Sequence, residues 1–129
     1  MYATTSYDYA IIRIVPHVER GECLNAGIIL YCPTRRFLGA LTHLDRQRLN
    51  AFAPQLDFST LQQELEHIVR ICDGRPGSGP LGQLSPSERF HWLVSPRSTV
   101  IQPSPVHSGI CDDPESALHH LLKKLVLLT

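Results

Sequence analysis

Residues 7–30 read YDYAIIRIVPHVERGECLNAGIIL. Two apolar runs that begin here, at 7–15 and 22–32, have the length and the alternation of β-strands. Pro16 ends the first run because proline cannot donate a hydrogen bond to a neighbouring strand. Gly27 lies inside the second run, which predicts a β-bulge or the close approach of another backbone. We therefore expect two adjacent antiparallel strands joined by a short connection.

The rest of the chain predicts further strands and three helices. Apolar residues at helical spacing follow Asp45, Asp57 and Asp113, and each aspartate is placed to cap a helix. The expected helices run from Asp45 to Ala53, from Asp57 to Gly74 and from Asp113 to Val126. The expected strands are Phe37–Thr42, Phe90–Val94 and Thr99–Gln102. The segment Gly74–Ser87, rich in proline and glycine, is either a plain surface connector or a lid.

These elements predict an α+β fold in a single domain, residues 1–129. Its antiparallel sheet has about five strands, and helices pack on one face, which is the usual way to cover such a sheet. A chain of 129 residues is long enough to bury one core without disulfides.

Charge and cysteine usage limit the class of protein. Lys+Arg and Asp+Glu number 12 each, which argues against a general affinity for membranes or nucleic acids, although a local basic patch would still allow a nucleic-acid contact. The N-terminal residues lack the features of a signal peptide, and no apolar stretch is long enough to span a membrane. We expect a cytoplasmic protein whose four cysteines are reduced thiols, with no bound metal and no cofactor.

Arg13 lies inside an apolar run, where an unpaired guanidinium destabilises the fold by several kcal/mol. One interpretation is a buried ion pair with Glu22 or Glu19 that sets the register of the strands. The other is an anion site in which Arg13 acts together with Arg20 and Arg97, because guanidinium groups bind phosphate and carboxylate well.

A second polar segment, PRSTVIQPSPVHSGICDDP, occupies residues 96–114. Arg97, Ser98 and Thr99 form a turn that is suited either to simple capping or to holding an oxyanion. His107 is a candidate general base, although a lone histidine is more often a structural hydrogen-bonding group. The chain has no GxGxxG, P-loop or G-x-S-x-G motif, so the standard kinase, NTPase and dehydrogenase interpretations fail.

Both segments resemble the paired motifs of an uncharacterised bacterial family of domains of unknown function. The matching residues are YDYA at 7–10 with Arg13, Pro16, Glu19, Arg20, Glu22, Asn25, Gly27 and 28–30, and later 96–102, 104–107 and Gly109. His17 departs from the pattern, which more often has Arg or Lys there. The resemblance implies a small cytoplasmic bacterial protein, and some members are encoded beside HipA-like kinases, which suggests a protein partner. It implies no activity.

Two functions remain open. The first is a non-enzymatic binding module that acts with a protein partner, such as a HipA-like kinase in a regulatory or defence pair, and recognises an anionic or phosphate-containing group. The second is a small phosphate-directed hydrolase or nuclease-like enzyme that uses His107 and the arginines. We favour binding because no complete acid–base or nucleophile set is visible. The candidate ligand-binding residues are Arg13, Arg20, Glu22, Asn25, Arg97, Ser98, Thr99 and Gln102, and the candidate catalytic residue is His107. We also expect the first strand and the Arg97–Gln102 segment to meet in one sheet, with their polar side chains facing one cleft.

Overall fold

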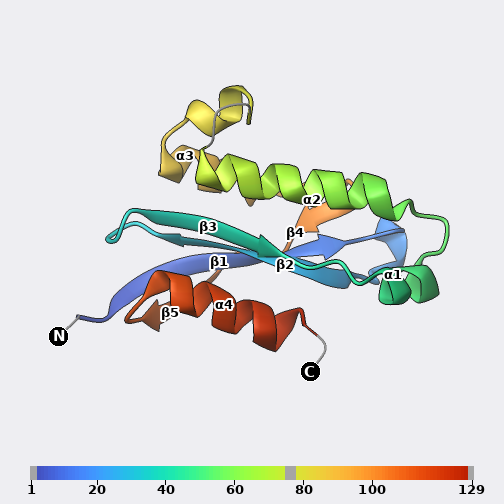
Figure 1. The fold of residues 1–129 in the computed structure, drawn as a ribbon, viewed down its shortest axis with the longest axis horizontal. Helices are drawn as coiled ribbons and strands as arrows, with labels where there is room; N and C mark the ends of the chain where they lie inside the picture. Colours follow the sequence, from blue (N-terminus) through green and yellow to red (C-terminus); the bar gives the residue numbers. More distant parts are fainter. Residues whose placement is uncertain (1–2, 75–77, 128–129) are drawn as a thin grey trace.

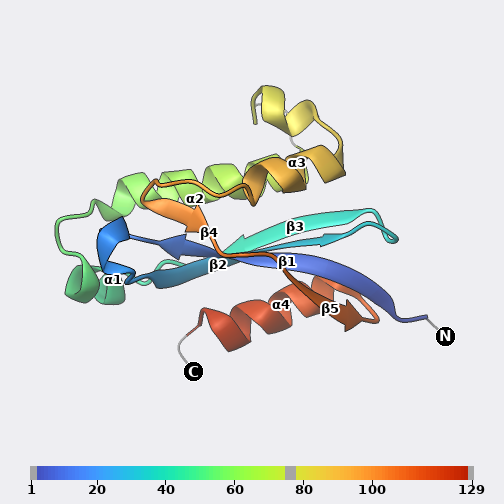
Figure 2. The same cartoon turned by 180° about the vertical axis from the view of Figure 1, so that it is seen from behind.

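The computed structural model describes residues 3–74 and 78–127. Within these residues a five-stranded antiparallel sheet forms the middle layer, and helices lie against both of its faces (Figures 1 and 2). The strand order is β3-β2-β1-β4, and β5 pairs with another part of β1. The strands are β1 Thr5–Ile14, β2 Leu24–Cys32, β3 Phe37–Thr42, β4 Ile101–Pro103 and β5 His107–Cys111.

The central strand is β1, which pairs with β2 along one edge and with β5 and then β4 along the other. Ser104 lies between β4 and β5, where Pro103 and Pro105 lack N–H groups. The Ser104 N–H donates to the Ile11 carbonyl at 2.8 Å, and its hydroxyl accepts from the Ile11 N–H at 2.8 Å. This buried serine therefore continues the hydrogen bonding of β1 past the two prolines.

The β-bulge predicted at Gly27 is confirmed. Ile12 pairs with Gly27 and Arg13 pairs with Asn25, so Ala26 is the extra residue in β2. A Cβ atom on Gly27 would lie 2.8 Å from the Leu41 carbonyl oxygen of β3. Glycine is thus required because a neighbouring backbone approaches closely.

The α+β class and the antiparallel sheet are also confirmed, but the helices cover two faces rather than one (Figure 1). One core contains Ile12 and Ile14, and the other contains Ile11. Because β1 is apolar on both sides, burying it requires a helical layer on each. The helices are α1 Arg46–Phe52, α2 Phe58–Asp73 and α3 Pro86–Leu93 in the first layer, with α4 Pro114–Leu125 in the second.

Three predicted helix starts are confirmed by side-chain capping. Asp45, Asp57 and Asp113 each accept a hydrogen bond from a backbone N–H three residues later. The hydroxyl of Thr60 also donates to Asp57, and this hydrogen bond lowers the pKa of the Asp57 carboxyl. Local side-chain chemistry is therefore enough to place these helix starts.

The predicted strand at Phe90–Val94 is wrong, because this segment belongs to α3. Ser85 and Glu88 form a capping box at the start of α3, and Pro86 occupies its first turn. Phe90 and Leu93 are one turn apart and both point into the core. Helix α3 thus begins inside the predicted Gly74–Ser87 loop.

Residues 75–77 of the Gly74–Ser87 loop lie outside the described residues. Its described portion includes η2, Pro80–Gln83, and another 3-10 turn, η1 at Val18–Arg20, connects β1 to β2. Across residues 3–74 and 78–127, no helix is both long enough and apolar enough to cross a membrane.

We predict that Gly27→Ala lowers the free energy of unfolding by about 1–3 kcal/mol, the usual range for overpacking a core. The added methyl group would approach the Leu41 carbonyl oxygen and the Ile12 side chain within 3 Å. Urea denaturation monitored by circular dichroism measures the loss. Ala51→Ser, at an exposed position of α1, is the control. Equal stability of Gly27→Ala and the natural protein would contradict the close packing at the bulge.

Candidate functional site

Three of the predicted site residues form a row across the sheet. Arg13 of β1 pairs with Asn25 of β2 on one side and with Gln102 of β4 on the other. Successive residues of a strand point to opposite faces. Ile12 and Ile14 belong to the core beneath α2, so the Arg13 side chain lies on the face that carries α4. The expectation that the first strand and the Arg97–Gln102 segment meet in one sheet is confirmed at this row.

Two donors in the row have no acceptor. Arg13 Nε and Gln102 Nε2 are both buried atoms without a hydrogen-bond partner. Asn25 differs, because its Nδ2 donates to the Leu125 carbonyl oxygen in the last turn of α4 at 3.1 Å. A buried donor without an acceptor destabilises the fold by about 1–3 kcal/mol. The row is therefore incomplete, and a carboxylate or phosphate oxygen would complete it.

Arg13 is not paired with Glu22 or Glu19, contrary to the first interpretation. Glu22 accepts a hydrogen bond from Arg20 Nε at 2.7 Å, and Glu19 lies 3.9 Å from His17. The connection after β1 carries these acids beyond the end of the sheet, whereas Arg13 stays within it. Among the described residues no ion pair involves Arg13.

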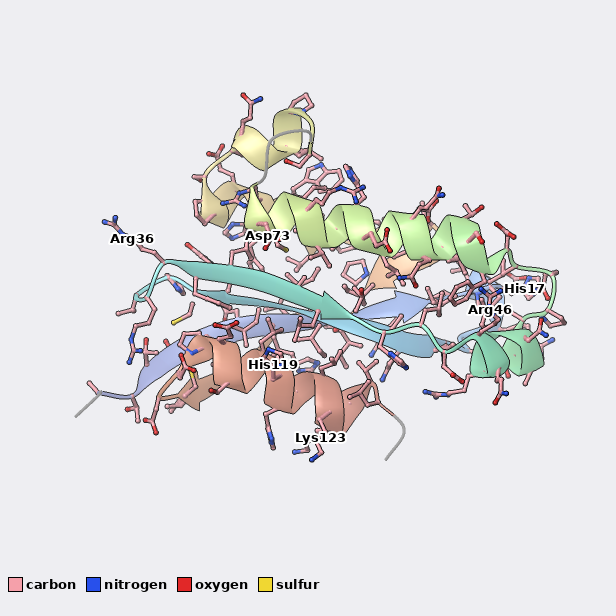
Figure 3. All side chains as sticks on the ribbon, viewed as in Figure 1. His17, Arg36, Arg46, Asp73, His119 and Lys123 are labelled. Carbon is pink, nitrogen blue, oxygen red and sulfur yellow. The ribbon has the colours of Figure 1, made fainter. Side chains whose placement is uncertain are left out.

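The Arg20–Glu22 pair borders a separate hollow of about 430 Å³. This hollow lies at the end of the molecule where His17 and Arg46 are seen in Figure 3. The side chains of Arg20 and Glu22 are 64% and 56% exposed, so water screens their attraction. The hollow is lined by Pro16, His17, Arg20, Glu22, Ala51, Phe52 and Gln55.

Arg97 lies on the opposite face of the sheet from Arg13. Its guanidinium stacks on the Trp92 ring at 4.7 Å, and its Nη2 donates to the Trp92 carbonyl oxygen at 2.6 Å. It borders a small hollow with Ile12 and Ile29, which belong to the core under α2. The single cleft expected for Arg13, Arg20 and Arg97 is therefore divided into three separate places.

Arg97, Ser98 and Thr99 do share a groove of about 590 Å³ with α2. Ile68, Ile71 and Ile101 contribute apolar surface to it, and Glu64 and His67 contribute charge and polarity. Thr99 is committed locally, because its hydroxyl donates to the Ile101 carbonyl oxygen at 2.7 Å. Trp92, Glu64 and His67 were not among the predicted site residues. Trp92 was missed because α3 was taken for a strand.

His107 is exposed at the start of β5 and contacts the Tyr9 ring at a centroid distance of 5.4 Å. It pairs with Tyr9, four residues before Arg13 along β1. Four residues of strand span about 13 Å, so His107 and Arg13 share a face but are not in hydrogen-bonding reach. Arg97 is on the other face. Neither Arg13 nor Arg97 is thus placed to act with His107 on one phosphate.

Cys72 and Cys111, the two cysteines whose pKa is raised, are not activated nucleophiles. All four are free thiols, and Cys32 and Cys72 are buried. Burial raises the pKa of Cys72 to about 12, so this thiol stays protonated at neutral pH. Burial also raises the pKa of Cys111. No group of three or more His, Cys, Asp or Glu residues that could hold a metal occurs within the described ranges.

The fold and these polar positions define the protein as a small α+β domain whose central strand carries an incomplete row of hydrogen-bond donors. The chain belongs to the family described as "Protein of unknown function (DUF3037)", whose model matches residues 9–126. This match confirms the resemblance to an uncharacterised family of domains of unknown function. Comparisons with curated proteins and with solved structures found no match.

We predict that Glu22→Leu lowers the free energy of unfolding by less than about 1 kcal/mol, as expected for an exposed ion pair. Urea denaturation of the variant and of Arg20→Leu measures the two effects. A loss of about 3 kcal/mol or more from Glu22→Leu alone is typical of leaving a buried cation without its partner. Such a loss would contradict the placement of Glu22 beside Arg20.

The raised pKa of Cys72 predicts a loss of stability at alkaline pH. Above the ordinary thiol pKa of 9.0 the unfolded chain releases this proton, whereas the folded protein retains it up to about pH 12. Stability should therefore fall as pH rises from 9, by up to about 1.4 kcal/mol per pH unit from this group. Urea denaturation between pH 8 and pH 11 measures the slope, which should be shallower in Cys72→Ala. Equal slopes in both proteins would contradict the prediction.

Proposed function

We propose that this protein is a small cytoplasmic bacterial binding module that recognises an acidic group of a protein partner at Arg13 and Gln102. The observation that carries the proposal is the pair of buried donors, Arg13 Nε and Gln102 Nε2, that lack acceptors on adjacent strands. Folding has already desolvated both atoms. A carboxylate or phosphate that reaches them gains charge-assisted hydrogen bonds without a new desolvation of the protein.

The position of the row supports access from outside. Helix α4 packs over β2 and β3. Gln102 belongs to β4, which lies beyond β1 in the strand order and is not covered by that helix. Arg13 itself is only half-buried. A group on a partner's surface can therefore approach beside α4, over β1 and β4. Asn25 holds the last turn of α4 in place and so defines one wall of this approach.

The separation of His107 from the arginines favours binding over hydrolysis. A phosphate-directed enzyme needs its base and its anion-binding groups around one reacting atom. His107 is about 13 Å along β1 from Arg13, estimated from the rise of a strand, and Arg97 is engaged with Trp92 on the other face. Among protein partners, a HipA-like kinase is the candidate implied by the family resemblance, and an acidic or phosphorylated segment of it would suit the row.

We predict that inorganic phosphate raises the melting temperature of the natural protein and not that of Arg13→Met. At ten times the dissociation constant the rise should be roughly 5 °C, which corresponds to about 1.4 kcal/mol of linkage. Gln102→Leu should weaken the effect. Without phosphate, Arg13→Met should be at least as stable as the natural protein, because it removes a buried donor without an acceptor. Differential scanning calorimetry at constant ionic strength measures all of these.

Two arginine variants serve as controls. Arg36→Met makes the same change in net charge at an exposed position that points away from the sheet at the β2–β3 turn (Figure 3). Arg97→Ala changes the groove on the other face. Both should keep the full response to phosphate. An unchanged response in Arg13→Met, or a response lost equally in Arg97→Ala, would refute the assignment of the anion to the Arg13 row.

A further inference from the structure

The two edges of the sheet are built differently. One edge is divided between the short strands β4 and β5, and Pro103 and Pro105 interrupt its N–H groups. The other edge is β3, a six-residue strand with the sequence FLGALT. It contains no proline and no charge, and its pairing with β2 runs without a register shift. Natural sheets usually protect an edge with such interruptions, so β3 has the features of an edge that accepts another strand.

A groove runs beside this edge. Its volume is about 370 Å³, and it is formed by Ala40, Leu41 and Thr42 of β3 together with Glu66, Val69 and Arg70 of α2. Alternate residues of an edge strand direct their N–H and C=O groups away from the sheet. The groove therefore offers backbone hydrogen bonds on one side and the side chains of a helix on the other. This combination suits an extended peptide that adds to a sheet as a further strand.

We propose that the groove between β3 and α2 binds an extended segment of another protein, which pairs antiparallel to β3 as a sixth strand. The site is separate from the Arg13 row, which lies across β2, β1 and β4.

The charges on α2 define the sequence that fits. Glu66 and Arg70 are four residues apart, or about 6 Å along the helix. Alternate residues of a strand are separated by nearly the same distance, about 7 Å. Helix α2 runs in the opposite direction to β3 (Figure 1), so a segment antiparallel to β3 passes Glu66 before Arg70. The matching pattern is a basic residue followed, two positions later, by an acidic one.

The same charges argue against a second copy of this chain as the occupant. A second β3 would present FLGALT, which has no charged residue to place opposite Glu66 or Arg70. Two-fold pairing of β3 would also bring the two α2 helices together, because α2 packs over this edge strand. A foreign strand with no helix attached avoids that crowding.

The test uses three labelled peptides and the full-length protein. The matching peptide is TVKVEVT, the charge-reversed peptide is TVEVKVT, and TVKPEVT has a central proline that disfavours strand pairing. Fluorescence anisotropy should give a dissociation constant at least tenfold lower for TVKVEVT than for either control. Amide chemical shifts in NMR spectra should change most along 37–42, with new contacts between the peptide and β3.

A charge-exchange variant makes the test specific. Glu66→Lys combined with Arg70→Glu keeps the net charge and should reverse the preference, so that TVEVKVT binds more tightly than TVKVEVT. Arg13→Met should bind TVKVEVT as the natural protein does, which separates this proposal from the anion site. Equal binding of all three peptides, or no binding, would overturn the proposal. Self-association through β3, seen as a dimer by light scattering with shifts confined to 37–42, would assign the edge to a second copy and would also overturn it.

Discussion

Burial of β1 on both faces is the constraint on which the rest of the structure depends. Ile12 and Ile14 face the layer formed by α1, α2 and α3, while Ile11 faces α4. A strand that is apolar on both sides cannot lie at the surface of a two-layer fold, so the chain must supply helices before and after β4 and β5. The same central position explains why β1 pairs on both of its edges, with β2 on one side and with β5 and β4 on the other.

Arg13 is the exception within this strand. Its neighbours in sequence are buried isoleucines, and its Nε lacks an acceptor. An apolar residue at this position would remove that penalty. Places where a sequence departs from the pattern that its fold requires are often sites of function. Gln102 of β4 pairs with Arg13 of β1, and its Nε2 also lacks an acceptor. The departure from the apolar pattern therefore involves two adjacent strands.

The alternation of side chains along β-strands explains why the predicted arginine cluster is divided. Arg13 lies in β1, and Arg97 lies in the segment that leads into β4, which pairs with β1. Before β4 begins, however, Arg97 stacks on Trp92 of α3, which packs on one face of the sheet only. Proximity within a sheet therefore does not imply a shared face. The Arg13 row, the groove beside Arg97 and the groove at the β3 edge are therefore separate places on the molecule.

Local physical chemistry was sufficient for much of the fold. The caps at Asp45, Asp57 and Asp113, the strand Phe37–Thr42 and the bulge at Gly27 each depend on side-chain hydrogen bonds, apolar periodicity or the size of one residue, and all could be predicted. Helix α3 was missed although the capping box at its start is also local. The aromatic residues that follow the capping box within α3 also favour a strand, and packing decides between helix and strand. The partner of Glu22, the face on which Arg97 lies and the placement of α4 opposite α2 could not be predicted. They depend on which residues, distant in sequence, meet across β1, and only the pairing and packing of the complete chain determine that.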